Sequence, residues 1–88
     1  MEKSIYSDDY RIFLQLLRQA REAADLTQEE VAERLGQTQS FVSKCERGER
    51  RLDIVEANAF CDAIGASFPE FVAEFIGVIK SQRKSKGS

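Results

Sequence analysis

The segment from Thr27 to Gly48 contains two short helix patterns with so brief a connection that few folds can hold both. The first pattern opens on Thr27, whose hydroxyl can accept a backbone N–H, and Glu30 completes a capping box. Gly36 ends this helix because glycine adopts the left-handed C-terminal conformation without a Cβ clash. Thr38 can then cap a second helix, which Gly48 stops. Two helices joined by so few residues must cross at a steep angle.

The second of these helices has one apolar and one polar face. Val42 and Cys45 fall on the inward side, whereas Gln39, Ser40 and Lys44 fall on the outward side. A glutamine amide can bond adenine in two places, and a lysine can donate to guanine O6 and N7. A polar helix edge of this kind suits the major groove of DNA, where residues near the helix start reach base edges. The pattern therefore predicts binding to double-stranded DNA.

The same segment resembles the Cro/CI-type helix-turn-helix, also called XRE-like, of the lambdoid phage repressors. The strings that carry the resemblance are Thr-Gln-Glu-Glu-Val-Ala-Glu-Arg-Leu-Gly and Ser-Phe-Val-Ser-Lys-Cys-Glu-Arg-Gly. Residues 28–47 match the usual motif, and weaker similarity extends over residues 8–76. The resemblance implies an all-α, lambda-repressor-like domain of five helices, with the motif at helices 2 and 3. It also implies a homodimeric transcriptional regulator that acts on a pseudo-palindromic operator. Cys45 departs from the family, which usually has a larger aliphatic residue there.

The resemblance assigns roles to single positions. The base-reading positions are Gln39, Ser40 and Lys44, with Ser43 as a lesser candidate. The phosphate-contacting positions are Gln28, Thr38, Arg47, Arg50 and Arg51. Each of these three arginines also fits a plain solvated charge. Phe41 has two readings, since its ring can touch a thymine methyl or pack across the two helices.

Arg21 and Glu46 form a separate prediction. The matching positions in the lambdoid repressors make a partly buried ion pair that ties two helices together. We expect the same structural pair here, because a carboxylate facing DNA would be repelled by phosphate. Both residues lie beside apolar neighbours, Ala20 and Cys45.

The remaining chain predicts further helices that support the motif. Ser7, Asp53 and Ser67 can each cap one of them. We find no strand pattern, and the sequence predicts one domain over residues 1–80. Residues 81–88 form a basic tail that we expect to fray.

The last predicted helix is more apolar than one buried face requires. Part of this surface is expected to face the domain core. The surplus predicts a two-fold dimer interface, since a large exposed apolar patch is unusual on a monomer. The residues expected at this interface are Phe71, Val72, Phe75, Ile76 and Ile79.

The overall charge of −2 conceals an uneven distribution. Lys44, Arg47, Arg50 and Arg51 lie close together in sequence, whereas residues 53–79 contain no Lys or Arg. This pattern predicts a basic edge that contacts DNA phosphate locally. It also predicts modest affinity for non-specific DNA, because the chain as a whole is acidic.

Several functional classes are disfavoured by what the sequence lacks. The 88 residues include no histidine and no Cys-x-x-Cys, so we expect neither a metal nor another cofactor. Without a phosphate-binding glycine loop or paired catalytic carboxylates, we do not expect an enzyme or a small-molecule substrate. The sequence shows no membrane-spanning run and no signal peptide, which predicts a cytoplasmic protein without membrane contact. Cys45 and Cys61 are expected to be buried hydrophobes, with a redox switch as the minor alternative.

A second functional class stays open. The same fold can serve as a protein-interaction module that binds a toxin, a sigma factor or another partner, and the short length also suits an antitoxin or a controller protein. An interaction face would be more apolar than the outward side of the second motif helix. RNA fits less well, because the deep and narrow major groove of A-form RNA excludes such a helix.

Overall fold

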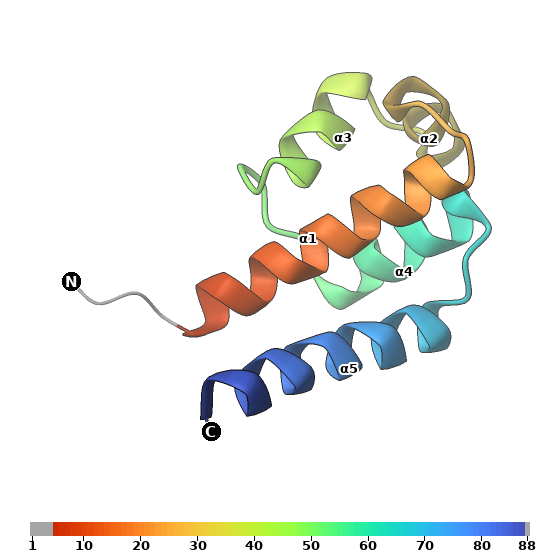
Figure 1. Cartoon of the computed structure of the whole chain (residues 1–88). Helices are drawn as coiled ribbons and strands as arrows, with labels where there is room; N and C mark the ends of the chain where they lie inside the picture. Colours follow the sequence, from red (N-terminus) through yellow and green to blue (C-terminus); the bar gives the residue numbers. More distant parts are fainter. Residues whose placement is uncertain (1–4, 88) are drawn as a thin grey trace.

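The computed structural model describes the backbone of residues 5–87 and the side chains of residues 8–82. Within that range the chain forms five helices and no strand, as expected for the all-α class (Figure 1). Their bounds are α1 Ile5–Ala23, α2 Gln28–Leu35, α3 Gln39–Glu46, α4 Ile54–Ile64 and α5 Phe68–Gly87. None of the described helices is both long enough and apolar enough to cross a membrane.

The ends of α2 and the start of α3 follow the predicted capping residues. The Thr27 hydroxyl accepts from the Glu30 N–H at 3.1 Å, and the Glu30 carboxylate accepts from the Thr27 N–H at 2.8 Å. Gly36 closes α2 with a φ of +69°. The Thr38 hydroxyl then accepts from the Phe41 N–H at 3.1 Å and begins α3. Local side-chain chemistry therefore fixes the turn between the two helices.

The start of α1 and the end of α5 bear on two expectations about the ends of the chain. Helix α1 begins at Ile5, so Ser7 lies inside the helix and the prediction that it caps α1 is wrong. Helix α5 continues without a break to Gly87. The boundary proposed at residue 80 stays a prediction, and Ser88 lies outside the described residues.

The core lies where α1 and α4 meet the back of α2 and α3, and α5 runs alongside α1 and α4 (Figure 1). Its most completely buried side chains are Leu17, Val31, Val42, Cys45, Phe60 and Cys61. The prediction that both cysteines are buried is confirmed, and both are free thiols. Burial raises the pKa of each thiol, which disfavours the reactive thiolate form.

Helix α5 divides its apolar residues between the core and the surface. The Phe71 side chain is only 5% exposed, and its ring meets the Phe13 ring edge-on at 5.8 Å. The Phe71 side chain has little surface left to bury against a second copy, and its place in a dimer interface stays a prediction. Val72, Phe75 and Ile79 remain partly exposed, and Ile76 is 41% exposed.

Candidate nucleic-acid interface

Helix α3 presents a polar edge to solvent while its opposite face is buried. Val42 and Cys45 have no exposed surface, whereas Gln39, Ser40 and Lys44 are exposed. The three principal residues predicted to read bases therefore lie together on the outside of the molecule. Ser43, the lesser candidate, is half-buried, and its hydroxyl accepts a hydrogen bond from the Arg47 guanidinium.

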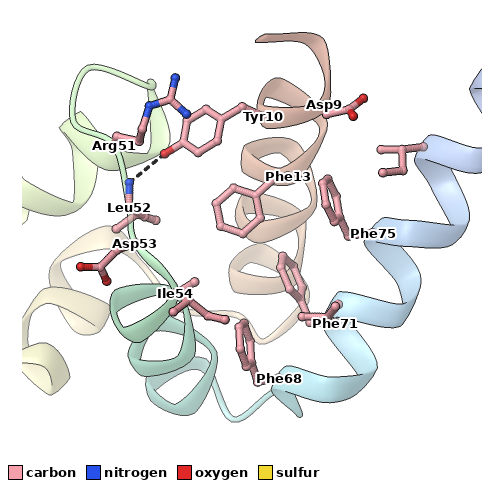
Figure 2. Close-up of a pocket in the computed structure, with 13 residues that line it drawn as sticks. Asp9, Tyr10, Phe13, Arg51, Leu52, Asp53, Ile54, Phe68, Phe71 and Phe75 are labelled. Atoms are coloured by element: carbon pink, nitrogen blue, oxygen red, sulfur yellow. Dashed lines mark hydrogen bonds between the residues drawn. The ribbon is translucent and has the colours of Figure 1, made fainter. Parts of the chain in front are cut away.

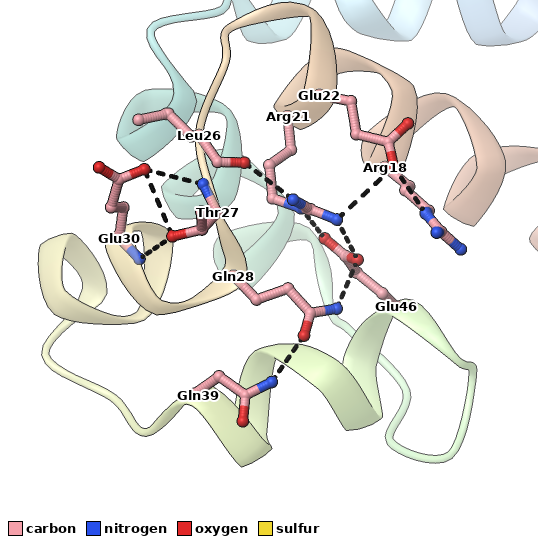
Figure 3. Close-up of polar contacts among 9 residues, drawn as sticks. All are labelled: Arg18, Arg21, Glu22, Leu26, Thr27, Gln28, Glu30, Gln39 and Glu46. Atoms are coloured by element: carbon pink, nitrogen blue, oxygen red, sulfur yellow. Dashed lines mark hydrogen bonds and ion pairs between the residues drawn. The ribbon is translucent and has the colours of Figure 1, made fainter.

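A chain of side-chain hydrogen bonds orients the amide of Gln39. Its Nε2 donates to Gln28 Oε1 at 2.7 Å, and Gln28 Nε2 in turn donates to Glu46 Oε1 at 2.9 Å (Figure 3). Gln28 thus links α2 to the first residue of α3. The Gln39 carbonyl oxygen and its second N–H remain available for a base edge.

The chain of hydrogen bonds ends on an ion pair between Arg21 and Glu46. Arg21 Nε lies 2.6 Å from Glu46 Oε2, and Nη2 lies 3.1 Å from Oε1 (Figure 3). The side chains are only 10% and 4% exposed. Arg21 Nη1 also donates to the Leu26 carbonyl at 2.8 Å. The pair that the sequence predicted therefore joins α1, α3 and the segment before α2, behind the exposed edge of α3.

The segment between α3 and α4 holds its arginines against carboxylates. Arg47 pairs with Glu49 at 3.0 Å, and Arg50 pairs with Glu56 at 2.9 Å. The hydrogen bonds and positive charge of these arginines lower the pKa of each glutamate, and the same contacts raise the pKa of each arginine. Two of the predicted phosphate contacts thus already have anionic partners in the protein.

Phe41 lies against the protein, in keeping with the packing alternative. Its ring stacks on the Phe60 ring at a centroid distance of 6.5 Å, and the Arg50 guanidinium carbon lies 4.9 Å from the Phe41 centroid. The ring is partly buried against the core. Phe41 therefore packs α3 against α4 and contacts Arg50 in the loop that follows α3.

A residue that the sequence did not single out anchors the same segment. The Tyr10 hydroxyl on α1 accepts from the Leu52 N–H at 2.9 Å (Figure 2). The Arg51 guanidinium carbon lies 4.3 Å from the Tyr10 ring centroid. Tyr10 thereby places Arg51, a predicted phosphate contact, next to α1. The partners are 42 positions apart, and no local pattern in the sequence connects them.

An apolar groove of about 440 Å3 lies between α1, the start of α4 and α5 (Figure 2). Aromatic side chains make up much of its lining: Tyr10, Phe13, Phe68, Phe71 and Phe75. Ile54 at the start of α4 also lines the groove and is 72% exposed, and Val55, which follows it, is 73% exposed. These two residues could not be singled out from the sequence, because they directly follow the capping residue Asp53 and fall outside the apolar stripe of α4. Among the side chains that the structure places, no cluster of Cys, Asp or Glu could hold a metal ion.

Comparison with known proteins agrees with this geometry. A family model described as a helix-turn-helix domain matches residues 12–75, which include all of α2, α3 and α4. The chain is also similar to the solved structure of an XRE-family like protein from Pseudomonas syringae pv. tomato str. DC3000. The two are 44% identical with a TM-score of 0.82, and the match covers 84% of this chain and 90% of that one. No curated protein matches the chain. The chain therefore belongs to the helix-turn-helix domain family and is an XRE-like DNA-binding regulator.

Proposed function

We propose that this protein regulates transcription by reading a specific sequence of double-stranded DNA. The observation that supports this most directly is the exposed polar edge of α3, whose opposite face is buried in the core. In the proposed complex α3 lies in the major groove. Gln39, Ser40 and Lys44 then contact base edges, with a smaller contribution from Ser43.

Residues around α3 position the protein on the phosphate backbone in this proposal. Such contacts set the register of the protein on the duplex but carry no direct sequence information. The proposed phosphate contacts are Gln28, Thr38, Arg47, Arg50 and Arg51. Gln28 has a second role, because its amide oxygen also accepts the hydrogen bond that orients Gln39.

We further propose that the protein acts as a homodimer on a pseudo-palindromic operator. A helix of eight residues is only about 12 Å long and reads a few base pairs, so a second copy is needed for a selective site. Two-fold symmetry would place the two α3 helices about 34 Å apart, in successive major grooves. The proposed interface on α5 consists of Val72, Phe75, Ile76 and Ile79.

The start of α4 extends the proposed dimer surface. Ile54 and Val55 are the most exposed large apolar side chains in the described part of the chain, and Ile54 lines the groove against α5. Contact between two copies would remove these side chains from water. The start of α4 directly follows the loop that carries Arg47, Arg50 and Arg51, three of the proposed phosphate contacts.

Selection of bound DNA from a random pool tests the proposed function. We expect the wild-type protein to enrich a two-fold symmetric motif with half-sites about one helical turn apart. The Gln39→Ala and Lys44→Ala variants should be selected in parallel, because both positions are exposed and the variants should still fold. Enrichment should then change at single positions of each half-site. If the folded wild-type protein enriches no sequence, the proposed function is wrong.

A further inference from the structure

Arg47, which the proposed function assigns to a DNA phosphate, is paired with a carboxylate on the same loop. Its Nε donates to Glu49 Oε2 at 3.0 Å and its Nη2 donates to Glu49 Oε1 at 3.1 Å. This two-point geometry is the one that a guanidinium also uses to bind phosphate. Glu49 therefore occupies the donors that a DNA phosphate would require.

The turn at Gly48 positions Glu49 next to the end of α3. Gly48 has a φ of +82°, and a Cβ there would also come within 3.2 Å of the Leu14 side chain. The turn lets the Glu49 N–H donate to the Lys44 carbonyl at 2.9 Å. Glu49 is thus fixed close to the end of α3, and its pKa is lowered first by Arg47 and to a smaller extent by the charge of Lys44. Its carboxylate therefore contacts Arg47, a proposed phosphate contact, and is close enough to Lys44, a proposed base contact, to interact with its charge.

The neighbouring pair of Arg50 and Glu56 is built differently. Glu56 also accepts from the Asp53 N–H at 3.0 Å, which completes the capping box of α4. Arg50 is also held by the Phe41 ring. In contrast, the Arg47 and Glu49 side chains are each 55% exposed, and Glu49 caps no helix. Glu49 can leave its arginine without breaking a helix cap, whereas Glu56 is also part of the capping box of α4.

We propose that Glu49 is an internal competitor of DNA phosphate for Arg47, and that it lowers the affinity of the protein for every duplex. This inference rests on the proposed function. When the protein is free, the carboxylate neutralises Arg47. When the protein binds, Arg47 turns to a phosphate and leaves the Glu49 charge close to the DNA. Glu49 thus limits how much contacts to the DNA phosphates contribute to the affinity. Sequence-independent contacts then do not outweigh the contacts to bases.

The test measures binding to a duplex of random sequence by fluorescence anisotropy at several salt concentrations. Glu49→Gln keeps the size of the side chain and removes its charge. We expect its affinity to rise about fivefold at low salt, which is the upper range for an exposed ion pair. The slope of log K against log salt should steepen by up to about 0.9, because the freed Glu49 charge no longer offsets the positive charge of Arg47 at the phosphates. Asp62→Asn is the matched control, since this exposed acid lies at the far end of α4.

A double-mutant cycle separates competition for Arg47 from a general effect of charge. In an Arg47→Gln background, Glu49→Gln should bring little further gain. A gain that persists without Arg47, or one that Asp62→Asn matches, would overturn the proposal. Unchanged affinity for Glu49→Gln in a protein that still binds duplex would overturn it as well, and would leave the proposed function intact. If no variant, including wild type, binds duplex at low salt, both inferences fail.

Discussion

The carboxylate of Glu46 accepts three hydrogen bonds, and replacing it with alanine leaves their donors without a partner. Two of these donors belong to the Arg21 guanidinium and the third to the Gln28 amide. The Glu46 side chain is 4% exposed and that of Arg21 is 10% exposed, so water cannot readily replace the carboxylate. The Glu46→Ala variant therefore tests how far the fold depends on one buried ion pair.

The expected loss can be worked out from these contacts. Removing one member of a buried pair costs about 3–5 kcal/mol, chiefly because the other charge stays buried without compensation. Arg21 Nη1 keeps the Leu26 carbonyl, and Arg21 Nη2 keeps Glu22 Oε2 at 4.0 Å, so we expect a loss in the lower half of this range. For a domain of this size, a loss of 3 kcal/mol lowers Tm by more than about 10 °C. The neutral variant Glu46→Gln should lose less, because the amide oxygen can still accept.

Urea denaturation followed by circular dichroism measures this loss directly. Glu49→Ala is a suitable control, since Glu49 is 55% exposed and pairs with the exposed Arg47. Such a surface pair contributes at most about 1 kcal/mol. A loss below about 0.5 kcal/mol for Glu46→Ala would show that the pair is solvated, and would refute the reasoning from burial.

Three further predictions concern DNA binding, assembly and pH. Lys44→Ala should cost about 1–3 kcal/mol on the selected operator and relax specificity at one base pair, whereas Arg50→Ala should weaken all duplexes alike. Equal losses for Lys44→Ala on operator and scrambled duplexes would exclude a base-reading role. Val55→Glu should sediment as a monomer with an unchanged Tm, because this side chain is 73% exposed in a single copy; a persistent dimer would place the interface elsewhere. Finally, Glu56 has a folded pKa below its ordinary value of 4.5, so its contribution to stability is present above pH 4.5 and is lost as the pH falls through the folded pKa. Glu56→Gln should accordingly flatten the acid limb of a stability curve recorded between pH 6 and pH 2, and an unchanged limb would contradict this assignment.

Helix boundaries were predictable wherever a capping side chain sets them locally. Thr27, Gly36 and Thr38 act through their own backbone neighbours, and the structure has them in these roles. Gly65 likewise ends α4 in the left-handed conformation. Ser7 was a misleading signal because a good capping residue is also tolerated inside a helix. Local chemistry thus predicts where most elements begin and end.

Contacts between distant segments were harder to predict. The periodicity of α5 identified its apolar residues but did not show that the core would cover most of Phe71. The carboxylate partners of Arg47 and Arg50 depend on the path of the loop after α3, which starts at Gly48 with its positive φ. The Arg21–Glu46 pair was predicted only because family resemblance supplied the two positions. The polar edge of α3 could be predicted without the resemblance, since the spacing of residues on a helix shows which of them share a face.

The bond from Tyr10 to the Leu52 N–H has a practical consequence for anyone who shortens this protein. Removing the first turns of α1 would leave Leu17 and Arg21 in place, so the shortened chain should still fold around its centre. It would nevertheless release the segment that carries Arg51. A shortened protein can therefore give the spectrum of a folded domain and still bind its target weakly, because the hydrogen bond from Leu52 to Tyr10, 42 positions away, is lost.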